Sequence, residues 1–283
     1  MAWTLRSLWL AVQSLVRPRT SYGRDTPLPA RLYKYTSLEA HHLARARNII
    51  VDREVYFANP ATFNDPFECR FRFSMNGTAA EWNQFLRRPE VAAENGLAPG
   101  AEPTAQQMAR WKSNALAHAP TVGDKFRANM QKDVGLLCLS EERDHILLWS
   151  HYANSHRGVC FGFSVADDPL FAQEITKVTY QDDFPIYEYF NPPEDVERIV
   201  FSTKSSQWSY EAEWRVIRVR MGEGEGAYRF APGTLRDVIL GSEISKSDRQ
   251  SLEQYVAKAP APPIALWVAE RVQTQYALTI KRV

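Results

Sequence analysis

The chain has 283 residues, of which 45% are hydrophobic, 12% aromatic and 24% charged. This balance is typical of a folded globular protein and excludes a largely disordered chain. The formal net charge of +1 excludes a surface built throughout for phosphate backbones, although it leaves room for a local basic patch. The length exceeds that of an average domain, and we expect one large domain over residues 31–283 that carries an insertion.

Residues 1–30 are expected to form an N-terminal helix and a linker. Residues 1–24 contain no acidic residue and place apolar side chains at helical spacing beside four arginines, which predicts a short amphipathic helix. Gln13 interrupts the apolar stretch and no small-residue cleavage site follows, so a signal peptide is not expected. We expect this helix to pack on the domain or on a partner rather than on a membrane surface, because its apolar stripe is short.

Cysteine content and hydropathy indicate the compartment. Cys69, Cys138 and Cys160 are odd in number and far apart, and two of them lie in apolar runs, where a thiol behaves as a small hydrophobic side chain. We therefore expect reduced thiols and a cytoplasmic protein. No run of about 18 apolar residues is present, so no membrane span is expected.

The first part of the domain, residues 31–73, consists of short aromatic segments. LYKYTS and VYFANP are expected as strands on either side of a helical SLEAHHLARAR, and TFNDPFECRFRF follows them. Residues 76–133 have a different pattern, with amphipathic stretches around the turn-rich ENGLAPGAEP. This pattern predicts a helical insertion of two or three helices at about residues 76–133.

Strands return after residue 133. VGLLCLSE, KVTYQDD and LRDVILG are each expected as one strand, and GVCFGFSV as a strand with one buried face formed by Val159, Phe161, Phe163 and Val165. DHILLWSHYANSH is expected as a helix, GEGEG as a hairpin or mobile loop, and Ser245 as the cap of a helix that ends near Val256. The last two segments, IALWVAERV and ALTIKRV, are expected to pair in antiparallel fashion.

Strands and helices do not alternate regularly along the chain. We therefore expect an α+β fold with a mainly antiparallel, split or bent sheet and flanking helices, rather than a doubly wound parallel sheet.

Several common sites are absent from the sequence. No glycine-rich phosphate loop stands between a strand and a helix, and there is no C-x-x-C motif. His151 and His156 are five residues apart, whereas two ligands on one helix face are three or four apart. No metal site is expected.

Two segments have both a structural and a functional interpretation. His151 and Tyr152 lie at a helix-to-strand corner, where they serve packing or face a cleft as contact and proton-transfer groups. Asn64 and Asp65 precede Pro66 in a turn, where they cap backbone donors or form the rim of a polar pocket.

The stretch FSTKSSQWSYEAEWRVI, residues 201–217, contains the acidic pair Glu211 and Glu213 ahead of a strand-like segment. One interpretation is a solvated strand face on which Glu213 pairs with Arg215, because exposed glutamates are common. The other is a pair of carboxylates that carry out chemistry.

Seven motifs in order resemble the bacterial family called domain of unknown function 2971, over about residues 31–257. They are LYKYTS, FANPATFNDPFE, LCLSE, LLWSHYANSHRGVCFGF, VTYQDD, FSTKSSQWSYEAEWRVI and VILGSEIS. The family implies a fold and a set of motifs and does not imply a reaction.

Three shorter segments resemble the ADP-ribosyltransferases. Those enzymes carry a His or Arg on a first strand, a hydroxyl motif on a second strand, and a late glutamate, often as Glu-x-Glu. Lys34, the hydroxyls of Ser202 and Thr203, and Glu211-Ala-Glu213 follow that order here. Lys34 stands where the superfamily has His or Arg, and Lys204 interrupts the hydroxyl run.

This resemblance implies that NAD is the substrate and that its nicotinamide glycosidic bond is cleaved. Glu213 would stabilise the positive charge that builds on the ribose, as a carboxylate does in glycoside hydrolysis. Glu211, expected two residues earlier on the same strand face, would orient the acceptor. Ser202 or Thr203 would line the nicotinamide pocket, and an aromatic side chain such as Tyr35 or Trp208 could stack on the ring.

We therefore expect a protein that acts on NAD or a related nucleotide in a cleft formed by LYKYTS, FNDPFE, WSHYA and EAEWR. The expected catalytic residues are Glu213, Glu211 and His151, and the expected cofactor-binding residues are Lys34, Tyr35, Asn64, Asp65, Tyr152, Ser202 and Thr203. Family-level analogy connects such enzymes with defence or toxin systems. The alternatives are another nucleotide- or nucleic-acid-directed enzyme and a non-catalytic sensing or protein-interaction domain.

Overall fold

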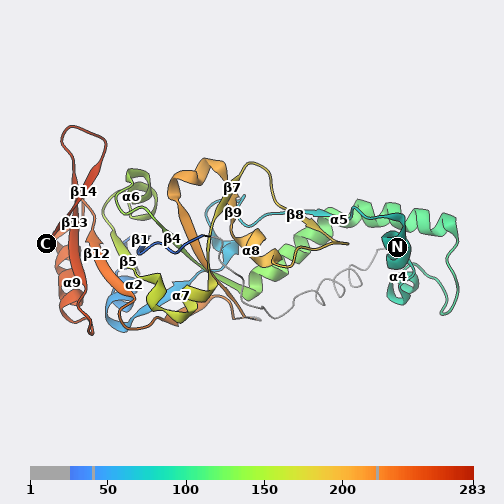
Figure 1. Ribbon diagram of the computed structural model, residues 1–283, viewed down its shortest axis with the longest axis horizontal. Coiled ribbons are helices and arrows are strands. Elements are labelled where there is room, and N and C mark those ends of the chain that lie inside the picture. Colours follow the sequence, from blue (N-terminus) through green and yellow to red (C-terminus); the bar gives the residue numbers. More distant parts are fainter. Residues whose placement is uncertain (1–25, 40–41, 221–222) are drawn as a thin grey trace.

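The structure, a computed structural model, describes residues 26–39, 42–220 and 223–283 (Figure 1). The helix expected over residues 1–24 lies outside the described residues. None of the helices formed by the described residues combines the length and hydropathy that a membrane crossing requires.

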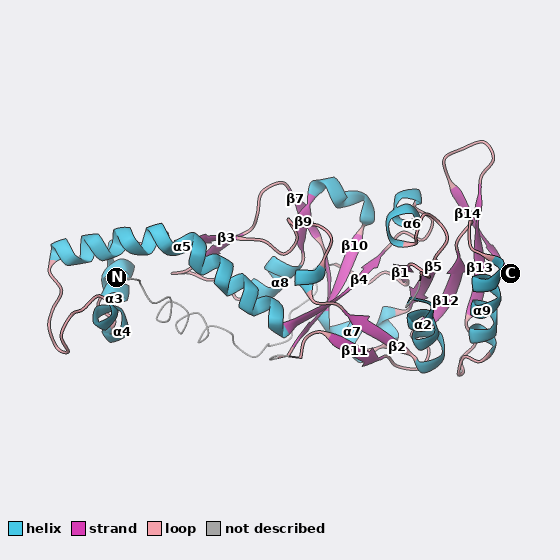
Figure 2. Ribbon diagram, turned by 180° about the vertical axis from the view of Figure 1, so that it is seen from behind, coloured by secondary structure: helices cyan, strands magenta, loops and turns pink. Residues whose placement is uncertain are grey.

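An eight-stranded sheet with the strand order β14-β13-β12-β5-β1-β4-β10-β6 extends from the middle of the molecule to the end at which β13, β14 and α9 lie (Figure 2). Its strands are β1 (Leu32–Thr36), β4 (Val134–Ser140), β5 (Val159–Phe163), β6 (Ile175–Lys177), β10 (Glu213–Val219), β12 (Leu235–Leu240), β13 (Ala265–Arg271) and β14 (Leu278–Arg282). Neighbouring strands are antiparallel except β12 and β13, which are parallel. The mainly antiparallel α+β fold expected from the sequence is therefore confirmed.

Three two-stranded sheets accompany the main one. They pair β2 (Glu54–Phe57) with β11 (Gly226–Arg229), β3 (Arg72–Ser74) with β8 (Ile186–Glu188), and β7 (Thr179–Gln181) with β9 (Thr203–Ser205). KVTYQDD was expected as one strand, and the structure divides it into β6 and β7. The break falls at Val178, whose N–H donates to the carbonyl of Glu213 while the next N–H donates to Ser202.

The helices of the main body are short and lie around the sheet. They are α2 (His42–Arg47), which continues into the π-helix η1 (Asn48–Asp52), α6 (Ile146–Tyr152), α7 (Pro169–Glu174), α8 (Val196–Phe201) and α9 (Lys246–Ala257), with the 3-10 helices η2 (Pro60–Thr62), η3 (Val165–Asp167) and η4 (Ser206–Glu211). The expected cap of α9 is confirmed, because the Ser245 hydroxyl accepts a hydrogen bond from the N–H of Asp248 at 3.0 Å.

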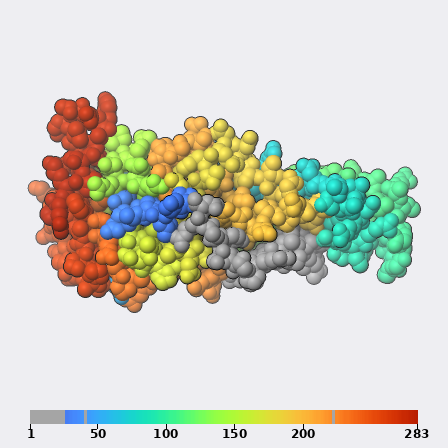
Figure 3. All heavy atoms as spheres, viewed as in Figure 1, coloured from blue at the N-terminus to red at the C-terminus, as the bar shows by residue number. Residues whose placement is uncertain are grey.

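The insertion forms three helices, α3 (Ala79–Leu86), α4 (Pro89–Glu94) and α5 (Ala105–Asp133). Capping boxes begin α3 at Thr78 and α5 at Thr104. The three helices build one end of an elongated molecule, opposite the C-terminal strands and α9 (Figures 1 and 3). Trp82 and Trp111 belong to a hydrophobic cluster separate from the one that covers β5 and β12.

β5 is buried on both faces rather than on one. Val159, Phe161 and Phe163 belong to the largest hydrophobic cluster, whereas Cys160, between them, belongs to a cluster with Trp149 of α6. The second buried face was not predicted, because small residues at alternate positions are also typical of a solvent-exposed face. In β5 these small residues permit close packing. A central strand flanked by β1 and β12 has no solvent face when helices cover both sides.

Asp168, which is fully buried, holds the segment between η3 and β11 in place. Its carboxylate accepts hydrogen bonds from the N–H groups of Leu170 (3.0 Å), Phe171 (3.1 Å) and Ala231 (2.7 Å) and from the Tyr228 hydroxyl (3.1 Å). Removal of this acceptor leaves buried donors without partners, which costs more than the mean value of a hydrogen bond.

We expect Asp168→Ala to lower the free energy of unfolding by about 3 kcal/mol, because it removes a helix cap and strands buried donors. Urea unfolding measures the effect. The matched control is Asp167→Ala, whose exposed carboxylate pairs with Arg236 at the surface and is expected to change stability little. Equal losses in the two variants would contradict this role of Asp168.

Candidate functional site

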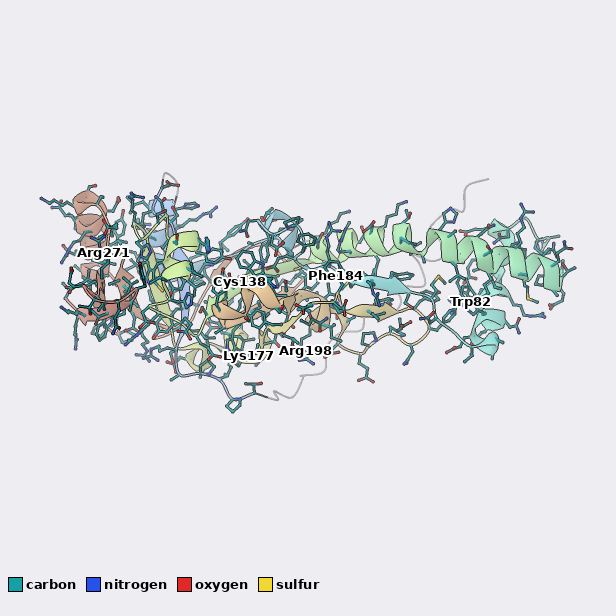
Figure 4. All side chains as sticks on the ribbon, turned by 90° about the horizontal axis from the view of Figure 1, so that it is seen from above. Trp82, Cys138, Lys177, Phe184, Arg198 and Arg271 are labelled. Atoms are coloured by element: carbon teal, nitrogen blue, oxygen red, sulfur yellow. The ribbon has the colours of Figure 1, made fainter. Side chains whose placement is uncertain are left out.

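A cavity of about 220 Å³ lies beside the part of the sheet formed by β1, β4 and β10. Its walls come from three separate regions of the sequence: Tyr33, Lys34, Tyr35, Tyr56, Ala58, Phe63, Asn64, Glu68, Leu136, Cys138, Leu139, Ser140, Leu148, Tyr152, Lys204, Glu211, Glu213 and Arg215. Cys138 marks its place near the middle of the molecule, between Arg271 at one end and Trp82 in the helical insertion (Figure 4). The insertion therefore does not cover the cavity with its tip.

Strand register explains why these residues meet. Ser140 of β4 is paired with Tyr33 of β1 on one side and with Glu213 of β10 on the other. Residues directly opposite one another on paired strands have neighbouring side chains. The pair Tyr33–Ser140 is the one register pair between β1 and β4, whereas β4 and β10 are paired along their full length. The cavity lies where β1 and β4 diverge beyond this pair.

Glu211 and Glu213 reach the cavity by different backbone paths. They were expected on one strand face, but Glu211 ends η4, and β10 begins only at Glu213. Ala212 between them has the left-handed conformation φ 43°, ψ 50°, which turns the chain between the short helix and the strand. The Ser140 hydroxyl donates to the Glu211 carbonyl at 2.6 Å and holds this turn against β4.

A buried ion network links the two glutamates. The ammonium group of Lys204 lies 2.6 Å from Glu211 Oε2, 3.1 Å from Glu213 Oε2 and 3.0 Å from Glu68 Oε1. The guanidinium of Arg215 donates from Nε to Glu213 Oε1 at 2.8 Å and from Nη2 to Glu213 Oε2 at 3.0 Å, and a further bond from Nη2 reaches Glu68 Oε2 at 2.8 Å. Three carboxylates therefore share two cations.

Glu213 is buried within this network, with 5% of its surface exposed, and its partner Arg215 is fully buried. Charges at such depth remain ionised only when partners compensate the loss of solvation. Burial by itself would raise the pKa of Glu213, but Arg215 and Lys204 outweigh it and lower this pKa to about 2. The interpretation of Glu213 as a residue on a solvated strand face is wrong, because its side chain is buried. The pairing with Arg215 that this interpretation included is present.

The pKa of Glu211 is shifted in the opposite direction. Burial raises its pKa above the ordinary value and outweighs the attraction of Lys204, while the negative charge of Glu213 acts in the same direction as burial. The Tyr152 hydroxyl donates to Glu211 Oε1 at 2.7 Å. Glu211 is thus the carboxylate of the network that binds protons more readily.

Lys34 projects into the cavity from the middle of β1. Burial lowers its pKa; the negative charge of Glu213 opposes this shift, and the positive charge of Arg45 adds to it. Within the described residues, no acceptor or acidic group lies within hydrogen-bonding or ion-pair distance of its ammonium group. Lys34 therefore differs from Lys204, which three carboxylates surround.

The cavity brings together six of the residues expected to form a site: Lys34, Tyr35, Asn64, Tyr152, Glu211 and Glu213. Asp65 does not line it, because its carboxylate accepts from the N–H of Phe67 at 2.8 Å and from Trp208 Nε1 at 2.9 Å. His151 is exposed on α6, with its ring edge toward Tyr152 and Trp208.

Ser202 and Thr203 do not line the cavity either. Their hydroxyls donate to the carbonyls of Arg198 and Ile199, so they serve the end of α8. The next residue, Lys204, takes the place in the cavity that was expected for a hydroxyl. In the sequence, Lys204 interrupts the run of hydroxyl residues, and this interruption was the signal that could have identified Lys204 as a cavity residue.

Tyr33, Phe63 and Glu68 lie in the segments LYKYTS and FNDPFE that were expected to form the cleft, but no role was assigned to them there. Tyr56, in a segment expected only as a strand, was missed, and Glu68 shows its role only when β10 brings Arg215 to it. Among the described residues, no group of three or more His, Cys, Asp or Glu side chains is arranged to hold a metal ion.

A family model described as "Protein of unknown function (DUF2971)" matches residues 148–216. No curated protein and no solved structure matches the chain. The matched segment begins in α6 and ends within β10, so it contains Tyr152, Lys204, Glu211, Glu213 and Arg215. It supplies the ion network except for Glu68.

The low pKa of Glu213 predicts a specific pH dependence of stability. Its value of about 2 in the folded chain lies below the ordinary 4.5, so ionised Glu213 stabilises the fold above about pH 4.5. That contribution is lost as the pH falls from 4.5 toward 2. We expect the urea midpoint to fall less steeply over this range in Glu213→Gln, whose side chain does not titrate.

The control is Glu253→Gln, which changes a surface carboxylate of α9 paired with Arg249. Because exposed pairs contribute little, this variant should keep the steep fall of the parent chain. A Glu213→Gln variant with the slope of the parent chain would show that Glu213 is not the stabilising carboxylate.

Proposed function

We propose that this protein is an ADP-ribosyltransferase-like enzyme that cleaves the bond between nicotinamide and ribose in NAD or a related nucleotide. The observation that supports the proposal best is the convergence of Lys34, Asn64, Tyr152, Glu211 and Glu213 on one cavity. These residues span more than a hundred positions of the sequence, and packing alone does not require them to meet.

The walls of the cavity suit a planar ring. Tyr33, Tyr35, Tyr56, Phe63 and Tyr152 all line it. Aromatic side chains bind a flat heteroaromatic group through stacked or edge contacts. Tyr35 is held rigidly for this purpose, because its hydroxyl donates to the Glu142 carbonyl at 2.8 Å and its ring packs edge-on against Trp149.

The carboxylates suit the charge that develops in the reaction. When the C1′–N bond breaks, its electron pair leaves with nicotinamide, and the ribose becomes an oxocarbenium-like cation. A fixed negative charge beside that cation lowers the barrier without reorganisation. Glu213 remains ionised at all physiological pH values because its pKa is about 2, and Arg215 and Lys204 fix its position.

Glu211 suits the second step. The acceptor oxygen or water bonds to C1′ and loses its proton, and a carboxylate whose pKa is raised is a better proton acceptor at neutral pH. The Tyr152 hydroxyl orients Glu211 at 2.7 Å. In this scheme His151 has no step, because it does not line the cavity, and Asn64 is available to bind a polar group of the ligand.

A second candidate function is nucleotide binding without turnover, as in a sensing domain. This candidate is favoured because both carboxylate oxygens of Glu213 already accept hydrogen bonds from Arg215 and Lys204. A carboxylate in this state supplies charge but does not grip a ribose hydroxyl. The two candidates share the ligand and differ in the release of nicotinamide.

We expect the full chain to release nicotinamide from NAD, and Glu211→Gln and Glu213→Gln each to slow release by about a hundredfold or more. Chromatography of the reaction mixture measures the released base, and thermal unfolding shows whether the variants fold. Glu253→Gln, far from the cavity on α9, should keep the parent rate.

Binding of NAD without release would support the second candidate. If NAD is neither bound nor cleaved, NAD is excluded as a ligand. If release of nicotinamide persists in both cavity variants, the two carboxylates are excluded from the mechanism.

A further inference from the structure

The cavity has an edge that carries positive charge. Tyr56 lines the cavity, and 43% of its surface is exposed. It therefore marks a place where the cavity opens to solvent. The guanidinium of Arg45 from α2 lies over the Tyr56 ring, 5.7 Å from its centroid. Lys34 also lines the cavity, and the charge of Arg45 acts on its ammonium group repulsively, whereas that of Glu213 attracts it.

These two cations lack acidic partners, unlike the other cations of the site. Within the described residues, neither Lys34 nor Arg45 takes part in an ion pair or donates a hydrogen bond. The acidic group at this edge, Glu225, accepts from the Tyr56 hydroxyl at 2.6 Å. Lys204 and Arg215, by contrast, are neutralised by three carboxylates.

The size of the cavity requires part of a nucleotide to lie outside it. Pockets that enclose drug-sized ligands have volumes of about 300–1,000 Å³. The 220 Å³ here accommodate a ring and a sugar but not a whole dinucleotide. Whatever is attached to the sugar must therefore leave through an opening, and the opening at Tyr56 is flanked by Arg45, with which no acidic side chain of the described residues forms an ion pair.

We infer that Lys34 and Arg45 bind a phosphate group of the ligand at this opening, so that the substrate class is a 5′-phosphorylated nucleoside rather than a free nucleoside. This inference rests on the proposed function for the base and the ribose. A guanidinium provides paired donors for phosphate oxygens, and a lysine adds a point charge from the other side. The bound phosphate also relieves the repulsion between the two cations.

The experiment compares nicotinamide mononucleotide with nicotinamide riboside, which differ by the 5′-phosphate, by calorimetry on the full chain. We expect the phosphorylated compound to bind at least about tenfold more tightly. In Arg45→Gln and in Lys34→Met this preference should fall to threefold or less. The matched control is Arg47→Gln, on the same helix, whose guanidinium pairs with Asp52 at the surface.

Thermal unfolding of each variant shows whether it is folded, and a folded Arg45→Gln is sufficient for the test because Arg45 is exposed. Equal affinities for the two compounds in the parent chain, or equal behaviour of Arg45→Gln and Arg47→Gln, would overturn the inference even if nicotinamide is released from NAD.

The same comparison with ribose 5-phosphate and ribose separates the inference from the proposed reaction, because neither sugar carries nicotinamide. An Arg45-dependent preference for the phosphorylated sugar, in a protein that releases no nicotinamide, would support the phosphate contact and refute the reaction. No preference in either pair of ligands would overturn the phosphate contact.

Discussion

The ammonium group of Lys204, buried among three carboxylates, is the interaction on which the cavity depends. Glu68, Glu211 and Glu213 would repel one another at this depth, and each would favour its protonated form. Lys204 and Arg215 compensate that repulsion through direct ion pairs. Removal of one partner from such a network leaves uncompensated charge, so the network tolerates little change.

The network also joins distant parts of the chain. Glu68 follows the turn after η2, Lys204 lies in β9, and Arg215 lies within β10. Arg215 further donates to the Phe201 carbonyl at 2.9 Å, which ties the end of α8 to the same point. Because the pairs have to form together, the loop over the cavity, the small sheet β7–β9 and the edge of the main sheet adopt one arrangement.

Two kinds of cation thus serve the site. Lys204 and Arg215 hold the carboxylates in position, and these carboxylates neutralise the positive charges of the two side chains. Lys34 lines the cavity and Arg45 lies over Tyr56 at the opening, and no acidic group of the described residues forms an ion pair with either. This asymmetry gives the cavity an acidic floor suited to a developing cation and a basic edge suited to an anion.

The sequence by itself determined the elements and several of the cavity residues. The alternating large apolar residues of β5, the Ser245 cap and the helical pattern of the insertion depend on neighbours within a few positions, and such local patterns are readable. Lys34, Tyr35, Asn64, Tyr152, Glu211 and Glu213 were identified because their motifs are compact. Only the tertiary structure decided that Glu213 is buried, that Lys204 replaces the hydroxyls in the cavity, and that Glu68 completes the network. These facts depend on strand register and on the left-handed turn at Ala212, which bring together charges separated by more than a hundred residues, and no local pattern encodes the compensation of one buried charge by another.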